Sequence, residues 1–226
     1  MYAIAKREFL TLFKSVKSVA IILLFIIVSF SISNFVKNNP VMAFGQESNP
    51  YISGIRFLVT FLGFLFVLAL SHDTLNREVE SQTMRFVVTK VSRTSVVLGK
   101  YLGILSFWIA CLSISVFAIF ISSQQFDLFE LMRLTAFLSY AIGMNMLLST
   151  IITKVSFSMF AGLICGLLVP VIGIWGTFSA KPVLQLIKYA TPYYYLLEEG
   201  WKSYIPFGFS ILFAAVSIFV FRRKDL

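Results

Sequence analysis

Long apolar stretches alternate with short polar ones along the whole chain. Six of these stretches approach the ~20 residues that a helix needs to cross the hydrocarbon core of a bilayer. Charged residues or helix breakers separate each from the next, so the pattern predicts an all-α membrane protein with six transmembrane helices. The expected spans are about Val19–Val36, Ile52–Ser71, Tyr101–Ser122, Leu134–Thr153, Val155–Phe178 and Tyr204–Phe221.

The composition supports this class. Hydrophobic residues make up 58% of the 226 residues, charged residues 13%, and the mean hydropathy is +0.88. Soluble domains average roughly 45–50% apolar and about 25% charged residues. A water-soluble fold could not cover this much apolar surface, so we expect residues 1–226 to form a single transmembrane domain.

The basic residues predict the orientation. With the N-terminus in the cytosol, 13 of the 19 Lys and Arg residues fall in cytosolic segments, as the positive-inside rule requires. Both termini are then cytosolic, and the net charge of +9 reflects membrane orientation and not nucleic-acid binding. The sequence shows no organelle-targeting feature and no glycosylation sequon, which favours the plasma membrane of a prokaryote.

Residues 1–18 have the pattern of an amphipathic helix. Tyr2, Ala5, Phe9, Leu12 and Val16 recur at spacings of three and four, and cations lie on another face. Such a helix lies in the headgroup plane of the cytosolic leaflet. The alternative is an orientation signal with no further role.

The polar segment 72–100 is long and mixed in charge, although small membrane proteins usually join their spans by short loops. Its pattern predicts two short helices with a bend near 89–92, with Ser92 as a helix N-cap. We also expect Leu75, Val79 and Phe86 to share one apolar side. A hairpin of this kind suits the docking of a soluble partner, and the alternative is a solvated connector.

Several residues of this segment give it a specific resemblance. Glu78 and Glu80 form an acidic pair, and Thr83 follows them. Ser92-Arg93 and Gly99-Lys100 precede the third span. This order resembles the first cytosolic loop of the permease subunits of type-2 ABC transporters, the ABC-2 membrane family. The chain departs from the family pattern in two places: Gln82 stands where a Gly often precedes the Thr, and Lys90 stands where a Pro often precedes Val-Ser-Arg.

The resemblance extends to the N-terminal helix, the six spans and the basic ending 221–226. It implies a dimeric exporter in which each permease copy, or a sister permease, rests on a separate cytosolic ATPase. Segment 72–100 would be the coupling loop of this ABC-2 (type V) exporter-like fold, with a second, smaller contact at Lys154. The residues expected to couple to the ATPase are Asp73, Arg77, Glu78, Glu80, Thr83, Arg85, Arg93, Lys100 and Lys154.

Nucleotide chemistry is expected on the partner. The chain contains no G-x-x-x-x-G-K-[ST] phosphate loop, so ATP and Mg²⁺ are assigned to the separate ATPase, and no cofactor or catalytic residue to this chain. One His and no Cys-x-x-Cys pattern predict no metal site.

Segment 177–203, between the last two spans, is rich in Pro, Tyr and Trp. Its pattern predicts short helices that dip back into the outer leaflet and break at Pro192. The resemblance implies an outer gate there, and the alternative is an ordinary aromatic belt. The residues assigned to the gate are Pro192, Tyr193, Tyr194, Tyr195, Glu198 and Glu199.

Inside the spans, Gly162 and Gly166 form a G-x-x-x-G motif, which allows two helices to approach closely. We read it as packing within the bundle, with a subunit interface as the alternative. Asn145 is expected either to join two helices by a hydrogen bond or to touch substrate.

Taken together, these features predict an ATP-driven exporter subunit for a hydrophobic or amphipathic cargo such as a peptide, lipid or drug. Two alternatives stay open: a membrane anchor or sensor subunit that only holds a cytosolic ATPase, and an ion-coupled secondary carrier. The carrier reading is weakened because no predicted span has an ionisable residue at its centre.

Overall fold

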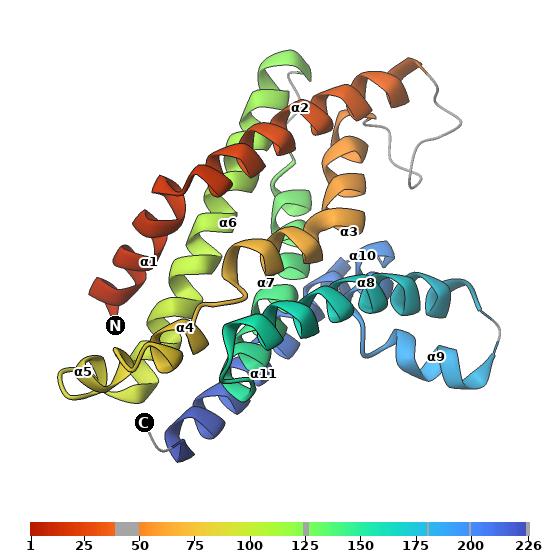
Figure 1. Ribbon diagram of the computed structural model, residues 1–226. Coiled ribbons are helices and arrows are strands. Elements are labelled where there is room, and N and C mark those ends of the chain that lie inside the picture. Colours follow the sequence, from red (N-terminus) through yellow and green to blue (C-terminus); the bar gives the residue numbers. More distant parts are fainter. Residues whose placement is uncertain (39–49, 124–126, 180, 199, 225–226) are drawn as a thin grey trace.

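A computed structural model describes residues 1–38, 50–123, 127–179, 181–198 and 200–224. These residues form helices joined by short turns and contain no strand (Figure 1). The helices are α1 (Tyr2–Lys14), α2 (Val16–Asn38), α3 (Pro50–Ser71), α4 (Asn76–Glu80), α5 (Met84–Val88), α6 (Arg93–Ser123), α7 (Leu128–Ile151), α8 (Val155–Phe178), α9 (Pro182–Lys188), α10 (Pro192–Leu197), the 3-10 helix η2 (Gly200–Tyr204) and α11 (Ile205–Arg223).

Five helices in the described part of the chain are long and apolar enough to cross a membrane. A bent pair, Tyr2–Lys14 and Ser18–Val28, makes a sixth span if its two parts are counted together; their axes differ by 67°. The predicted all-α class is therefore confirmed, and five to six helices are long and apolar enough to span a membrane where six spans were predicted. The five helices are Gly54–Glu80, Arg93–Ala118, Leu128–Ile151, Val155–Phe178 and Gly200–Arg223.

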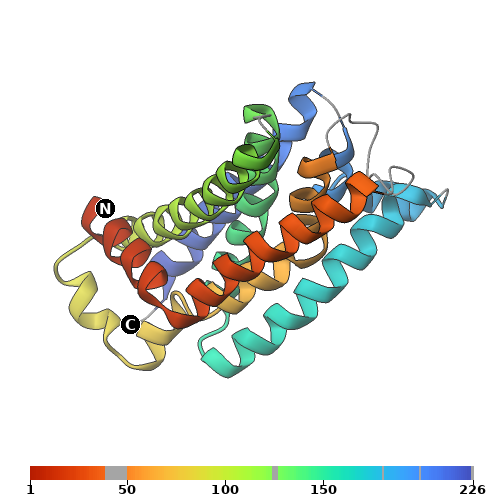
Figure 2. The same ribbon diagram turned by 90° about the horizontal axis from the view of Figure 1, so that it is seen from above.

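Helix α7 lies at the centre of the bundle, with α3, α6 and α11 packed around it (Figures 1 and 2). Its middle is buried on every side, because every residue from 134 to 143 is buried. Aromatic rings fill the space beside it: Phe64 and Tyr193 both stand edge-on or tilted against Phe137. Helix α8, by contrast, lies at the outside and exposes Phe157 and Phe160.

Two helices begin earlier than the hydrophobic pattern predicts, and in each case a polar side chain caps the first turn. Asp127 Oδ1 accepts hydrogen bonds from the backbone N–H groups of Phe129 and Glu130, at 2.9 and 3.1 Å, so α7 begins at Leu128. Ser92 Oγ accepts a hydrogen bond from the backbone N–H of Ser95 at 3.3 Å, and α6 begins at Arg93, before the apolar run that was expected to start at Tyr101. The prediction of Ser92 as an N-cap is thus confirmed.

The N-terminal helix ends at Ser15, where the backbone becomes extended. Of the residues on the expected apolar face, Leu12 is buried, whereas Tyr2 and Val16 are 79% and 84% exposed. Helix α1 packs on α6 at two glycines. A Cβ at Gly99 would lie 2.9 Å from Ile4 Cβ, and one at Gly103 would lie 2.7 Å from the Ala5 carbonyl oxygen.

Polar groups join the helices inside the bundle. Asn145 Nδ2 donates to the backbone oxygen of Ser71 at 2.7 Å, so this side chain links α7 to the end of α3. Near the other end of the same two helices, Arg56 and Glu130 form a buried ion pair at 2.7 Å. Glu130 is 74 residues from Arg56 in the chain, so the sequence pattern does not show this pairing.

The G-x-x-x-G motif of α8 faces α3. A Cβ on Gly162 would lie 3.0 Å from Leu68 Cδ2, and one on Gly166 would lie 2.6 Å from Leu68 Cδ1. The same buried stripe continues to Gly173, against the ring of Tyr193. These glycines therefore let α3 and α10 pack closely on α8 within one copy of the chain.

Candidate functional site

Both ends of the described chain meet the α4–α5 hairpin at one end of the molecule (Figure 1). Lys224 Nζ donates to the Thr150 carbonyl oxygen at 2.5 Å, which holds the end of α11 beside the end of α7. Arg93, the first residue of α6, donates to the carbonyl oxygens of Phe221, Arg222 and Lys224 at 3.3, 3.0 and 2.6 Å. The segments expected in the cytosol are thus adjacent in space.

The hairpin is a pair of one-turn helices with a tight turn between them. Gln82 in this turn has φ 57°, a left-handed conformation that favours glycine. Thr83 Oγ1 donates to the Glu78 carbonyl oxygen at 3.3 Å and lies 2.9 Å from Ser81 Oγ. The sequence predicted a single first helix and a bend near 89–92; the structure adds this second break at 81–83, where the backbone reverses.

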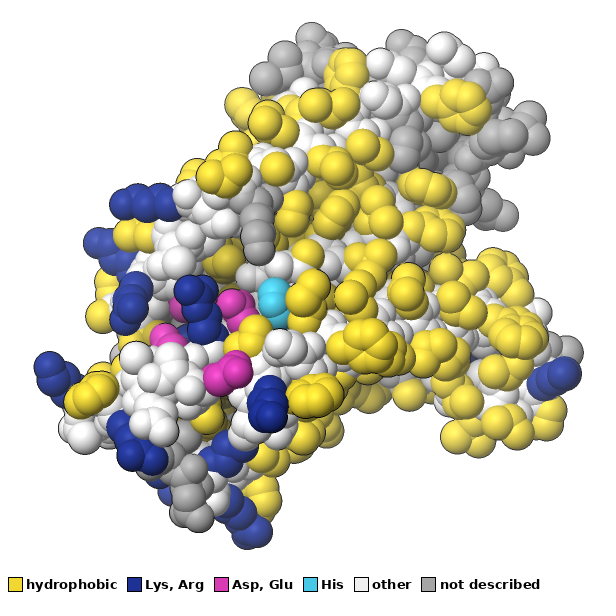
Figure 3. All heavy atoms as spheres, viewed as in Figure 1, with side chains coloured by type: hydrophobic (Ala, Val, Ile, Leu, Met, Phe, Trp, Pro, Cys, Tyr) yellow, Lys and Arg dark blue, Asp and Glu magenta, His cyan; other side chains and the backbone are white. Residues whose placement is uncertain are grey.

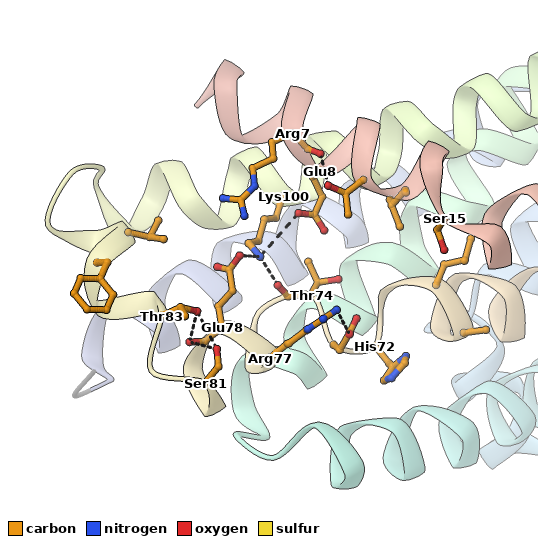
Figure 4. A pocket seen from close by; sticks show the side chains of 17 residues that line it. Arg7, Glu8, Ser15, His72, Thr74, Arg77, Glu78, Ser81, Thr83 and Lys100 are labelled. Atoms are coloured by element: carbon orange, nitrogen blue, oxygen red, sulfur yellow. Dashed lines mark hydrogen bonds and ion pairs between the residues drawn. The ribbon is translucent and has the colours of Figure 1, made fainter.

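Lys100 forms the base of the hairpin. Its ammonium lies 2.9 Å from Glu78 Oε1, 2.5 Å from the Thr74 carbonyl oxygen and 4.0 Å from Glu8 Oε2 (Figure 4). Lys100 is only 4% exposed. Because a buried ammonium needs compensating acceptors, this cluster fixes α1, α4 and α6 relative to one another.

Glu80 is also bound within the chain. Its Oε2 accepts from the backbone N–H of Val155 at 2.9 Å, which places the carboxylate at the first turn of α8 beside exposed Lys154. The sequence-based hypothesis gave Glu78 and Glu80 to an ATPase. The geometry gives both of them partners inside the chain, and it brings segment 72–100 together with the 152–154 turn.

The remaining predicted coupling residues differ in exposure. Arg77 pairs weakly with Asp73 at 3.5 Å, and its side chain is 77% exposed. Thr83 and Arg85 are exposed at the end of the hairpin. Phe86 is 76% exposed, although the sequence placed it on one apolar side with Leu75, which is fully buried. That expectation was wrong because the break at 81–83 rotates α5 relative to α4.

A pocket of about 660 Å³ opens between α1 and the hairpin. Figure 3 shows acidic side chains and the histidine gathered in this hollow, with basic side chains around it. Burial raises the pKa of the Glu8 carboxyl, and the nearby Lys100 ammonium opposes that rise. Sequence reasoning did not assign Arg7, Glu8 or His72 to a site; an acidic residue in an otherwise basic helix was the available signal for Glu8.

At the other end of the molecule, α9 and α10 form the short helices expected in segment 177–203. Pro192 begins α10, as predicted for the break. Tyr193 is buried, and its hydroxyl donates to the Thr60 carbonyl oxygen at 3.1 Å. Tyr195 is also buried and donates to the Tyr189 carbonyl oxygen at 2.9 Å.

Two further groups of this region lie nearer the surface. Glu198 lies 3.5 Å from Lys202, and a hydrogen bond from Tyr194 lowers the pKa of the Glu198 carboxyl. Glu199, also assigned to the gate, lies outside the described residues. The structure thus packs Pro192, Tyr193 and Tyr195 into the bundle and leaves Tyr194 and Glu198 partly exposed.

No protein-family model and no curated protein matches the chain. Among the residues that the structure describes, no three His, Cys, Asp or Glu side chains are grouped so that they could hold a metal ion.

Proposed function

We propose that this chain is the membrane-spanning permease subunit of an ATP-driven exporter of the ABC-2 class. A separate ATPase docks on segment 72–100 and supplies ATP and Mg²⁺, and two permeases, identical or sister chains, form the pathway. The cargo is hydrophobic or amphipathic, because the spans are rich in Phe and poor in charge. In this proposal both termini are cytosolic, α1 lies along the membrane surface, and Pro192 with its neighbours forms the outer gate.

The main support is the placement of the α4–α5 hairpin. It lies at the end that carries both chain termini and the 152–154 turn, so every segment that the positive-inside rule assigns to the cytosol is at one end (Figure 1). An exposed hairpin beside a second short turn offers one continuous surface to a soluble partner.

The structure also changes which residues are proposed to touch the ATPase. Because Glu78, Glu80 and Arg93 have partners inside the chain, the docking surface falls to the exposed tip of the hairpin. There, Phe86 offers an exposed aromatic anchor and Arg85 a charge beside it. Exposed aromatic and Arg side chains are the groups that most often dominate binding energy at interfaces.

The internal partners of the other residues suit coupling. Glu78 holds the hairpin to α6, Glu80 holds it to α8, and Asn76 Oδ1 accepts from Ser149 Oγ on α7 at 3.1 Å. A displacement of the hairpin would therefore move three membrane helices as a body, as rigid-body switching requires.

The test is co-purification of the chain with candidate ABC ATPases from the same genome. The double variant Arg85→Glu/Phe86→Ala should lose the ATPase, since both changes lie at the exposed tip. Its matched control is Lys181→Glu/Leu186→Ala, which makes the same kinds of change on exposed residues at the opposite end. We expect the control to retain the ATPase.

The outcomes separate the alternatives. Retention of the ATPase by wild type and control, with loss in the tip variant, supports docking at the hairpin. Stimulation of the bound ATPase by apolar cargo then supports export, and binding without any stimulation favours the anchor or sensor role. If no ATPase associates with the wild type, the exporter proposal fails.

A further inference from the structure

The pocket between α1 and the hairpin has two carboxylates at its base, Glu8 and Glu78. Lys100 is the cation that faces both Glu8 and Glu78, at 4.0 and 2.9 Å. Burial raises the pKa of the Glu8 carboxyl, the charges of Lys100 and Arg7 oppose that rise, and the neighbouring Glu78 carboxylate adds to it. The buried Glu78 Oε2 makes no hydrogen bond within the described part of the chain. The base thus has spare acceptors for a donor-rich cation.

The rim of the same pocket carries cations. Arg7 extends from α1 into the pocket, and Arg77 reaches it from α4 (Figure 4). Arg77 has only a 3.5 Å contact to Asp73, which leaves most of its guanidinium donors for other groups. Guanidinium groups on opposite walls form a suitable site for a phosphate.

The third part of the lining is apolar. Leu12 of α1 and Ala69 and Leu70 of α3 form the wall nearest the long apolar helices. Helix α3 ends at Ser71, so the pocket lies at the level where its apolar run stops. In Figure 3 hydrophobic side chains continue from the edge of the hollow along the neighbouring helices. A ligand here would have polar groups in the pocket and an apolar tail along the bundle.

We propose that this pocket binds the headgroup of an aminophospholipid, with its primary ammonium at Glu8 and at Glu78 Oε2, the oxygen that makes no hydrogen bond to the described residues, and its phosphate at Arg7 and Arg77. The site has the volume for such a group, about 660 Å³. Carboxylate acceptors beside Lys100 at the base and guanidinium groups from α1 and α4 suit the ammonium and the phosphate of an ethanolamine phosphate. A choline headgroup has no N–H to donate to Glu78, and a glycerol headgroup has no cation.

This inference does not depend on the exporter proposal. It needs only the lining of the pocket and its level at the end of the apolar helices. If it is correct, a lipid bridges α1 and the α4–α5 hairpin at the cytosolic surface, so the lipid composition would affect how firmly the hairpin is held.

The test is native mass spectrometry of the full chain released from detergent, titrated with phosphatidylethanolamine, phosphatidylcholine and phosphatidylglycerol of identical acyl chains. Phosphatidylethanolamine should bind roughly tenfold or more tightly than the other two, the ratio expected for charged hydrogen bonds. Soluble glycerophosphoethanolamine should compete only at far higher concentration, because it lacks the tail that contacts Leu12 and Leu70.

Two single variants test the two halves of the site. Glu8→Gln should reduce the preference for ethanolamine over choline, and Lys100 would still have Glu78 as its partner. Arg7→Gln should weaken the binding of phosphatidylethanolamine, and Lys6→Gln, an exposed neighbour outside this pocket, is the matched control. Thermal unfolding of each variant checks that it is folded.

Three results would overturn the proposal. Equal binding of phosphatidylcholine and phosphatidylethanolamine would show that Glu8 and Glu78 do not bind the ammonium. If the Arg7→Gln variant binds phosphatidylethanolamine as tightly as the Lys6→Gln variant does, Arg7 does not bind the phosphate. Competition by glycerophosphoethanolamine at concentrations similar to those of the lipid would show that the ligand is a soluble phosphate ester and not a membrane lipid.

Discussion

The Lys100 ammonium on α6 lies 2.9 Å from the Glu78 carboxylate on α4, and this ion pair joins the exposed hairpin to a long apolar helix. Lys100 also donates to the Thr74 carbonyl oxygen just after α3. Two residues that the sequence assigned separately to a partner thus bind each other. The hairpin is therefore a fixed part of the fold and not a loose connector.

Removing Lys100 should destabilise the protein. Lys100→Met leaves Glu78 without its cation, and breaking a buried pair costs about 3–5 kcal/mol, somewhat less here because Glu78 is partly exposed. We expect thermal unfolding in detergent to shift down by several degrees. Lys90→Met, at an exposed position of the same segment, is the matched control and should unfold near the wild-type temperature. Equal unfolding temperatures for the two variants would show that the pair contributes little.

Glycine at position 82 should stabilise the hairpin. Gln82 has φ 57°, a conformation that costs a residue with a Cβ roughly 1 kcal/mol. Gln82→Gly should therefore slow hydrogen exchange of the amides in residues 76–88. Gln82→Ala keeps the Cβ and should show no such gain. Faster exchange in the glycine variant than in the alanine variant would contradict the assignment of strain to this turn.

A larger residue at position 103 should detach α1. A Cβ at Gly103 would lie 2.7 Å from the Ala5 carbonyl oxygen, and backbone cannot move away as a flexible side chain can. Gly103→Val should increase hydrogen exchange along Tyr2–Lys14. Gly208→Val is the control, since nothing lies within 4 Å of a Cβ there. If both variants leave α1 equally protected, α1 does not depend on this close contact.

Loss of the Arg93 guanidinium should loosen the end of α11. Arg93 donates to the carbonyl oxygens of Phe221, Arg222 and Lys224 at the end of α11, where backbone carbonyls lack the partners that the helix interior supplies; the Phe221 oxygen also accepts from the Lys224 N–H at 3.4 Å. Arg93→Gln should raise hydrogen exchange over residues 219–224 and leave the middle of α11 unchanged. Arg85→Gln, a change of the same kind at an exposed position, should leave this region protected. An unchanged exchange pattern in Arg93→Gln would show that water replaces the guanidinium without cost.

The fold class was predictable because it depends on the composition of the chain and on the spacing of its hydrophobic residues. A stretch such as Val155–Phe178 is apolar enough to define a helix without knowledge of its neighbours, and the observed bounds of α8 agree with the prediction. Helix starts were less predictable where a polar cap extends the helix beyond its apolar run. Asp127 does this for α7, and its effect depends on local backbone geometry.

The candidate site was predictable only in its location. The sequence marked segment 72–100 through its length and mixed charge, and it marked Glu78, Glu80 and Arg93 as residues of interest. It could not show that these side chains are bound to Lys100, to Val155 N–H and to the end of α11, because each partner is distant in the chain or on another helix. Nor could it show that Phe86 is exposed, because this depends on the left-handed turn at Gln82 that separates α5 from α4.

The sequence by itself determined that this chain is helical, that it has several stretches apolar and long enough to cross a membrane, and that its charged residues gather in a few segments. These properties follow from local composition, which sets the solvent that each segment prefers. Only the tertiary structure decided which charged side chains are bound to other groups of the chain and which are exposed. That decision depends on distances between helices, such as the approach of Glu8 on α1 and Glu78 on α4 to one buried lysine.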